Sequence, residues 1–140
     1  MEPNGIVAEF SILVVDDNEG TRETVAVVLS GSGYRCESAK NGVEAMQKVR
    51  QSRFDAVVTD LEMPEMDGIA LTRELRQSFS GLPVMIMTGH SADDCKEKAF
   101  RAGAREFLSK PFDVRDLIRK LHGMLPGYNM TKEQLTPERA

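Results

Sequence analysis

Two kinds of segment alternate along this chain, and this alternation constrains its fold more than any other feature. Short runs rich in valine, isoleucine and leucine are separated by longer stretches whose apolar residues recur every three or four positions. We expect strands at 12–15, 34–38, 54–59, 83–87 and 105–109. The first, third and fourth runs are almost continuously apolar, which is typical of central parallel strands covered on both faces. Right-handed crossovers then predict a single domain built on a doubly wound, five-stranded parallel sheet with helices on both faces.

The stretches between the strands have the period of amphipathic helices. Their expected sheet-facing residues are Thr21, Val25, Val28 and Leu29; Ile69, Thr72, Leu75 and Phe79; Ala92, Cys95, Ala99 and Ala102; and Val114, Leu117, Ile118, Leu121, Met124 and Leu125. Gly31 and Gly33 are expected to end the first helix in left-handed conformations. Phe100 lies off its stripe, either as an inconsequential exposed residue or as part of a partner surface.

The pattern covers residues 11–125, between an N-terminal leader at 1–10 and a flexible C-terminal tail at 126–140, with no effector domain expected after it. The composition, 41% hydrophobic and 29% charged, is that of an ordinary globular protein. Scattered basic residues and a net charge of −4 argue against direct nucleic-acid binding.

Neither a membrane span nor a signal peptide is recognisable in the sequence. The two cysteines, Cys36 and Cys95, lie in separate predicted elements and do not have the spacing of metal ligands or of a disulfide framework. We therefore expect a cytoplasmic protein with no membrane partner.

Polar residues follow the expected strands at their carboxyl ends, where a doubly wound sheet binds ligands. Asp16 and Asp17 follow the first strand, Asp60 the third, Thr88 the fourth and Lys110 the fifth. Clustered carboxylates raise one another's pKa unless a cation lies among them, and a hard divalent ion such as Mg²⁺ prefers oxygen ligands. A carboxylate there can attack phosphorus while the metal and a lysine neutralise the phosphoryl oxygens.

Together these residues resemble the receiver domains of response regulators, the family that includes chemotaxis and phosphorelay regulators, whose fold is flavodoxin-like. The likeness spans about residues 11–124. It is carried by Asp16 and Asp17 after an apolar run, the segment from Asp60 to Gly68 (DLEMPEMDG), Thr88 with Gly89, and Lys110 with Pro111 and Phe112.

The resemblance implies that Asp60 is the phosphoacceptor and that Asp16, Asp17, Asp60 and the backbone carbonyl of Glu62 make up the Mg²⁺ site, Asp16 through a water. It implies that Lys110 pairs with the phosphoryl group and that the Lys110–Pro111 peptide is cis. The partners would be a histidine kinase or histidine phosphotransfer protein and a downstream protein, with a dimer through the fourth helix, fifth strand and fifth helix as a further possibility.

The same family likeness suggests a conformational readout of phosphorylation. Thr88 would move towards the phosphoryl group, and Phe107 would rotate into the space that Thr88 leaves. Phe107 has no hydroxyl to hold it outside, so its inward state is expected to be favoured even without phosphate; it could equally be only a core aromatic. Glu62 and His90 occupy positions that modulate hydrolysis of the acyl phosphate in this family.

Two other functions can be weighed against this interpretation. Phosphatases of the haloacid dehalogenase class also use a carboxylate nucleophile, but they need an aspartate two residues later, where Glu62 stands. A receiver that only scaffolds its partners is disfavoured because every residue that the chemistry requires is present. The sequence therefore favours a phosphoacceptor switch that catalyses only its own phosphorylation and dephosphorylation.

Overall fold

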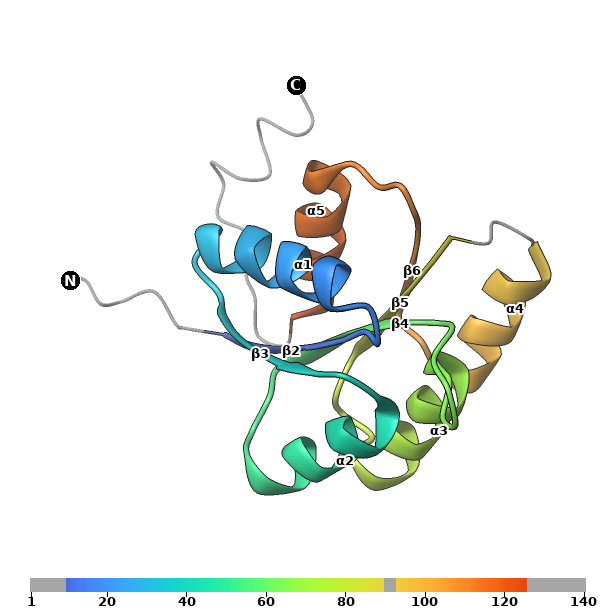
Figure 1. The fold of residues 1–140 in the computed structure, drawn as a ribbon. Coiled ribbons are helices and arrows are strands. Elements are labelled where there is room, and N and C mark those ends of the chain that lie inside the picture. The colour runs from blue at the N-terminus through green and yellow to red at the C-terminus, as the bar shows by residue number, and fades with distance from the viewer. Residues whose placement is uncertain (1–9, 90–92, 126–140) are drawn as a thin grey trace.

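Five strands and five helices alternate along the chain in the computed structural model, which describes residues 10–89 and 93–125 (Figure 1). The strands are β2 (Ser11–Val15), β3 (Arg35–Ala39), β4 (Ala56–Asp60), β5 (Val84–Thr88) and β6 (Glu106–Ser109). The helices are α1 (Glu19–Gly31), α2 (Gly42–Gln51), α3 (Gly68–Ser78), α4 (Asp93–Ala102) and α5 (Val114–Met124). Every expected strand is confirmed, with ends displaced by at most two residues.

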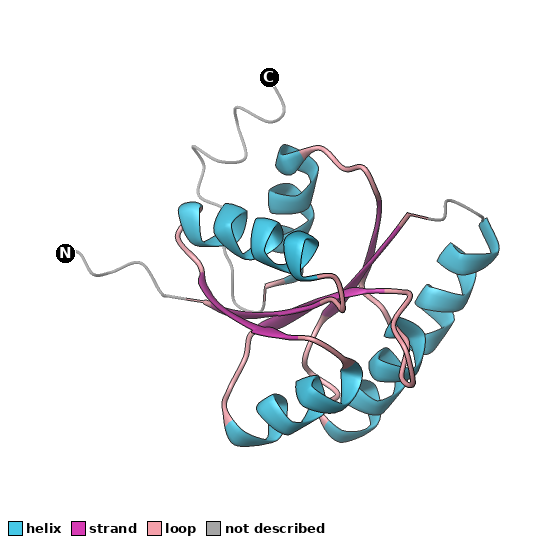
Figure 2. Ribbon diagram, viewed as in Figure 1, coloured by secondary structure: helices cyan, strands magenta, loops and turns pink. Residues whose placement is uncertain are grey.

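The strands form one parallel sheet in the order β3-β2-β4-β5-β6. The helices cover both of its faces (Figure 2): α1 and α5 lie on one, and α2, α3 and α4 lie on the other (Figure 1). This is the predicted doubly wound fold. The order reverses between β2 and β4, and the crevice at such a switch point is where these folds bind ligands.

Because strand side chains alternate between faces, the sheet separates two hydrophobic cores. One core joins Leu13, Val57 and Ile86 to α2, α3 and α4, and the other joins Val14 and Met85 to α1 and α5. Strands β4 and β5 are buried along their whole length. The central strands are thereby held rigid, and so are the residues at their carboxyl ends.

The helix stripes are largely confirmed, with three corrections. Val114 is 47% exposed because it begins α5 beyond the edge of the core. In α3, the fully buried Leu71 was missing from the predicted stripe, whereas Ile69 and Phe79 are only partly buried. Gly31 is the last residue of α1, and of these two glycines Gly33 alone has the left-handed backbone, with φ +100°.

On α4, Ala99 and Ala102 are buried as expected, Cys95 is partly buried and Phe100 is 41% exposed. Ala92 lies outside the described residues, as do the tail at 126–140 and all of the leader except Phe10. Among the described helices, none has both the length and the apolar character to cross a membrane.

Candidate functional site

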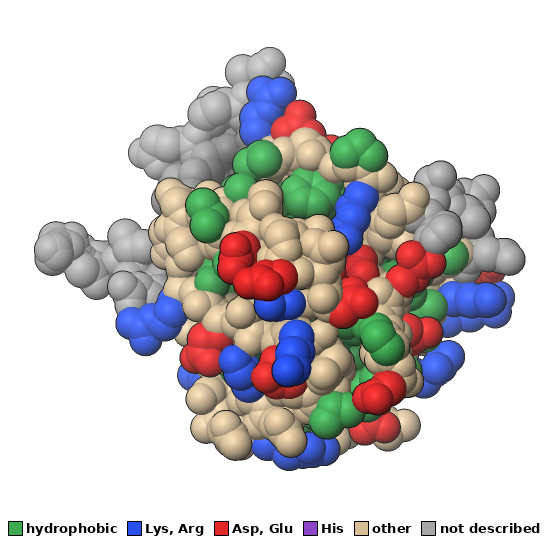
Figure 3. Space-filling model, in the orientation of Figure 1, with side chains coloured by type: hydrophobic (Ala, Val, Ile, Leu, Met, Phe, Trp, Pro, Cys, Tyr) green, Lys and Arg blue, Asp and Glu red, His purple; other side chains and the backbone are tan. Residues whose placement is uncertain are grey.

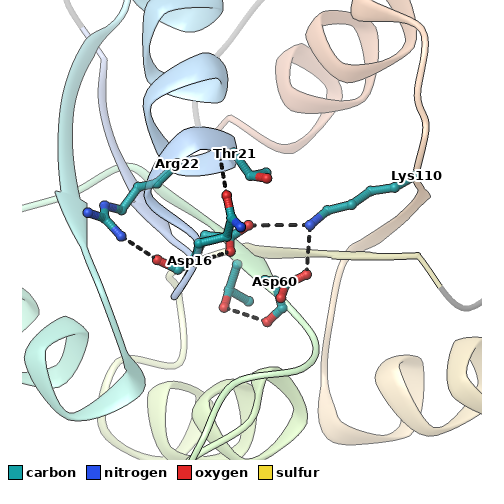
Figure 4. A network of polar contacts seen from close by, with 7 residues as sticks. Asp16, Thr21, Arg22, Asp60 and Lys110 are labelled. Atoms are coloured by element: carbon teal, nitrogen blue, oxygen red, sulfur yellow. Dashed lines mark hydrogen bonds and ion pairs between the residues drawn. The ribbon is translucent and has the colours of Figure 1, made fainter.

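The carboxyl ends of four strands bring together the polar residues singled out in the sequence. Asp16 follows β2, Asp60 and Thr88 are the last residues of β4 and β5, and Lys110 comes directly after β6. Figure 4 shows the Lys110 side chain reaching across the edge of the sheet towards Asp16 and Asp60. Residues separated by up to 94 positions in sequence therefore meet in one site.

Lys110 connects the two buried carboxylates. Its Nζ donates to Oδ1 of Asp60 at 2.9 Å and to Oδ2 of Asp16 at 3.3 Å. Its backbone N–H also donates to the carbonyl oxygen of Thr88 at 2.7 Å. The Lys110–Pro111 peptide is cis, as the family resemblance implied. The ammonium group is thus held between Asp16 and Asp60 by both its side chain and its backbone.

Asp16 is held in place by two residues whose importance at the site was not predicted. The Asn18 N–H donates to Oδ1 of Asp16 at 2.9 Å, and the Asn18 side chain caps α1 by accepting from the N–H of Thr21. A guanidinium nitrogen of Arg22 donates to the Asp16 carbonyl oxygen at 2.7 Å. An asparagine just before a helix is a recognisable capping signal. The contact of Arg22 has no such signature in the sequence.

Asp16, Asp17 and Asp60 form a compact group of carboxylates. One oxygen from each lies within 4.8 Å of the others. Asp16 and Asp60 are buried, whereas Asp17 is exposed. Hard divalent cations prefer such oxygen ligands, and three carboxylates facing one lysine leave an excess of negative charge. The donor set therefore fits Mg²⁺, with Asp17 on the side open to solvent.

The titration of Asp60 reflects this crowding. Burial raises the pKa of its carboxyl group, the hydrogen bond from Lys110 opposes that rise, and the charges of Asp16 and Asp17 add to it. Burial by itself would lower the pKa of Lys110, but the hydrogen bond to Asp60 and the charges of Asp16 and Asp60 outweigh it and raise the pKa. Lys110 therefore stays protonated while Asp60 remains a comparatively basic carboxylate.

The loop from β4 to α3 turns back directly beside Asp60. The N–H of Gly68 donates to the carbonyl oxygen of Leu61 at 2.8 Å, and Asp67 caps α3 by accepting from the N–H of Ala70. A Cβ at Gly68 would lie 2.4 Å from the Asp60 carbonyl oxygen. Only glycine allows this close approach. Glu62, the predicted donor of a backbone carbonyl to the metal, is exposed in this loop.

The remaining predicted residues lie at different depths around the site. Thr88 is completely buried at the end of β5. Phe107, with 6% of its surface exposed, packs in the core on the side of α2, α3 and α4. His90 lies outside the described residues. His122, in the last turn of α5, is half-buried, and its ring meets that of Tyr34 edge-on with 5.7 Å between the ring centroids.

Residues 12–122 match the family model of the response regulator receiver domain. Response regulator MprA from Mycobacterium sp. (strain KMS) is 38% identical over 114 residues, which cover 81% of this chain and 50% of MprA. Transcriptional regulatory protein ZraR from Klebsiella oxytoca is 37% identical over 128 residues, which cover 91% of this chain and 29% of ZraR. The chain thus matches half or less of the length of these two relatives.

The fold is similar to solved structures of a chemotaxis protein and of a putative response regulator. Chemotaxis protein CheY4 from Vibrio cholerae has a TM-score of 0.80 and 31% identity, covering 84% of this chain and 100% of that one. A putative response regulator from Chloroflexus aurantiacus J-10-fl also has a TM-score of 0.80 and 31% identity, covering 84% of this chain and 98% of that one.

Proposed function

Because this chain belongs to the response regulator receiver domain family, we propose that it is a switch that accepts a phosphoryl group on Asp60, with Mg²⁺, from a phosphohistidine donor. One observation carries the proposal: the Lys110 ammonium lies between Asp60 and Asp16, in a group of three carboxylates at the switch point of the sheet. This arrangement supplies a nucleophile, a metal site and a fixed positive charge together.

In the proposed reaction, a carboxylate oxygen of Asp60 forms a bond to phosphorus as the P–N bond of phosphohistidine breaks. The electron pair of that bond goes to the imidazole nitrogen, which leaves. Asp16, Asp17, Asp60 and the carbonyl of Glu62 would hold Mg²⁺, which supplies charge neutralisation for the phosphoryl oxygens. Lys110 adds a fixed cation next to Asp60, and Thr88 would donate its hydroxyl to the phosphoryl group.

The burial of Asp60 supports its role as the nucleophile. Its raised pKa marks a carboxylate that is less stabilised by water than a surface aspartate and is therefore more basic. Asp55, directly before β4, serves as the control aspartate for Asp60. Its Oδ2 accepts a hydrogen bond from the N–H of Ser11, which is a structural contact. Asp55 is separated from Asp60 by the length of β4.

The test uses phosphoramidate or acetyl phosphate with Mg²⁺, followed by intact-mass measurement. The wild-type chain and Asp55→Asn are expected to gain one phosphoryl group, Asp60→Asn is expected to gain none, and EDTA should prevent the reaction. Undiminished labelling of Asp60→Asn would refute the assignment. Sustained hydrolysis of p-nitrophenyl phosphate by the wild type would instead favour a phosphatase.

We further propose that Thr88 and Phe107 report the phosphorylated state. The buried position of Phe107 in the absence of phosphate agrees with an inward preference. The proposal requires the ring to change orientation or mobility when beryllofluoride mimics the phosphoryl group. Identical NMR spectra of the Phe107 ring with and without beryllofluoride would contradict it.

The proposed partners follow from this chemistry. A histidine kinase or histidine phosphotransfer protein in the cytoplasm would supply the phosphoryl group, and a downstream protein would recognise the switched state. The downstream protein, or a second copy of this chain, would dock on the face made by α4, β6 and α5. On this face Phe100 is 41% exposed and Arg115 is also exposed. Selective loss of partner binding in Phe100→Ala, with phosphorylation unchanged, would support this surface; unchanged binding would argue against it.

A further inference from the structure

A groove lies beside the proposed phosphorylation site, and its lining does not include Asp60, Thr88 or Lys110. It is an open groove of about 780 Å³ between the β4–α3 loop, helix α3 and helix α4. Figure 1 shows α3 and α4 next to each other on the same side of the sheet. Small-molecule sites in proteins have volumes of roughly 300–1,000 Å³. The groove therefore has the size of a ligand site, and of its lining residues the proposed phosphoryl chemistry uses only the backbone carbonyl of Glu62.

The groove offers apolar surface to a ligand. Leu61 and Met63 line it and are 6% and 8% exposed, and the partly buried Ile69 and Cys95 pack against the same core. In Figure 3, hydrophobic side chains reach the surface in the region of α3 and α4, with charged side chains around them. A methionine side chain adapts to ligands of different shape. This lining suits a short alkyl or aromatic group.

Two cations lie in the groove, one from each helix: Arg73 from α3 and Lys98 from α4. Among the side chains that the structure describes, those of residues 10–89 and 95–125, no carboxylate forms an ion pair with either cation. In contrast, Arg101 of α4 pairs with Glu97 at 3.0 Å. A guanidinium and an ammonium that line one groove without pairing to its carboxylates are complementary to a further anionic group.

The acidic residues of the groove, Glu62 and Asp67, belong to the loop before α3. Asp67 already caps α3, accepting the Ala70 N–H at 2.8 Å. Arg73 lies six residues farther along the helix, which corresponds to about 9 Å. An anion beside Arg73 is therefore separated from the carboxylate of Asp67, and an apolar group can lie over Met63 and Ile69.

We propose that this groove binds a small amphipathic organic anion, a carboxylate on a short apolar body, with the carboxylate between Arg73 and Lys98. The site gives the domain a second input besides phosphorylation. The β4–α3 loop forms one wall of the groove and begins immediately after Asp60, so an occupied groove contacts the loop that borders the phosphorylation site.

The test is an NMR titration of the ¹⁵N-labelled, metal-free full chain with octanoate below its micelle concentration. Saturable shifts are expected in residues 61–73 and 95–98. Octyltrimethylammonium has the same body with the opposite charge, and acetate has the charge without the body; both are expected to bind at least about tenfold more weakly, since tenfold corresponds to about 1.4 kcal/mol. Equal binding of either probe would overturn the proposal.

The decisive variant is Arg73→Gln with Lys98→Gln, which should weaken octanoate binding by about tenfold or more. The control is Lys96→Gln with Arg101→Gln, which removes the same charge from α4 outside the groove. Dispersed amide spectra establish that each variant is folded. Unchanged affinity in the first variant, or an equal loss in the control, would overturn the proposal, as would shifts caused by an acidic peptide but not by octanoate.

The Asp60→Asn variant separates this proposal from the proposed phosphorylation. Octanoate should bind to it as it binds to the wild type, because Asp60 does not line the groove. A failure of phosphorylation would then leave the octanoate result intact, and a failure of octanoate binding would leave the phosphoacceptor assignment intact.

Discussion

Replacing Gly68 with alanine is expected to lower the free energy of unfolding by about 1 to 3 kcal/mol, the range found when an extra methyl group is forced into a well-packed site. The new Cβ would lie 2.4 Å from the Asp60 carbonyl oxygen and 3.0 Å from the Leu61 Cα. Both are backbone atoms, so no side chain can rotate to relieve the contact. The start of α3 must move away from the end of β4, which strains the hydrogen bond from Gly68 to Leu61.

The matched control is Gly123→Ala in α5. A Cβ at Gly123 meets nothing within 4 Å outside its own helix. Alanine is favoured over glycine inside a helix by up to about 1 kcal/mol, so Gly123→Ala should be neutral or stabilising. The two substitutions add the same methyl group to a helix, yet only Gly68→Ala should destabilise the protein.

Urea unfolding followed by circular dichroism measures both effects, with Mg²⁺ removed by EDTA. The midpoint should fall in Gly68→Ala and hold or rise in Gly123→Ala, with unchanged slopes. In thermal unfolding, the Tm of Gly68→Ala should fall by about 4 to 12 °C. A Gly68→Ala variant as stable as the wild type would refute the reasoning, because the backbone would then have absorbed the methyl group without cost.

Three further predictions concern the site and the core. Asp60→Asn should raise the free energy of unfolding of the metal-free protein at pH 7 by about 1 kcal/mol, because it removes one buried carboxylate from a cluster of three while Lys110 keeps its contact with Asp16. Because folding raises the pKa of Asp60, the wild type loses stability as pH rises through that pKa, so the urea midpoints of the two proteins should converge at low pH, and a pH-independent difference would contradict this. Lys110→Met should destabilise the protein in EDTA by about 1 to 3 kcal/mol, because Asp16 and Asp60 lose their counter-charge. The double variant with Asp60→Asn should regain part of that loss, and unfolding free energies that simply add in the double-mutant cycle would count against the contacts. Leu71→Ala should lower the free energy of unfolding by about 2 to 5 kcal/mol, because Leu71 is fully buried. Val27→Ala, at a position that is 69% exposed, should change it by no more than about 0.5 kcal/mol. Equal shifts of the two urea midpoints would show that burial does not determine these changes.

Local pattern was enough to predict the fold because strands and helices bury their side chains with different periods. Apolar runs located the central strands β2, β4 and β5, and the alternation with helical stretches located β3 and β6. Their parallel, right-handed connection placed Asp16, Asp60, Thr88 and Lys110 at one edge of the sheet. The family resemblance added the chemical roles, which remain proposals. Periodicity was weakest in α3, where Leu71, not Ile69 or Phe79, is completely buried.

The sequence by itself determined which residue types stand at the carboxyl end of each strand, because that depends only on neighbours along the chain. Only the tertiary structure decided which of two adjacent aspartates is buried, that Arg22 binds the Asp16 carbonyl, and that Lys110 lies between Asp16 and Asp60. It also decided that α3 and α4 leave a groove with two basic side chains. These features depend on the order of strands in the sheet and on the packing of helices against it, which bring together residues that no local period relates.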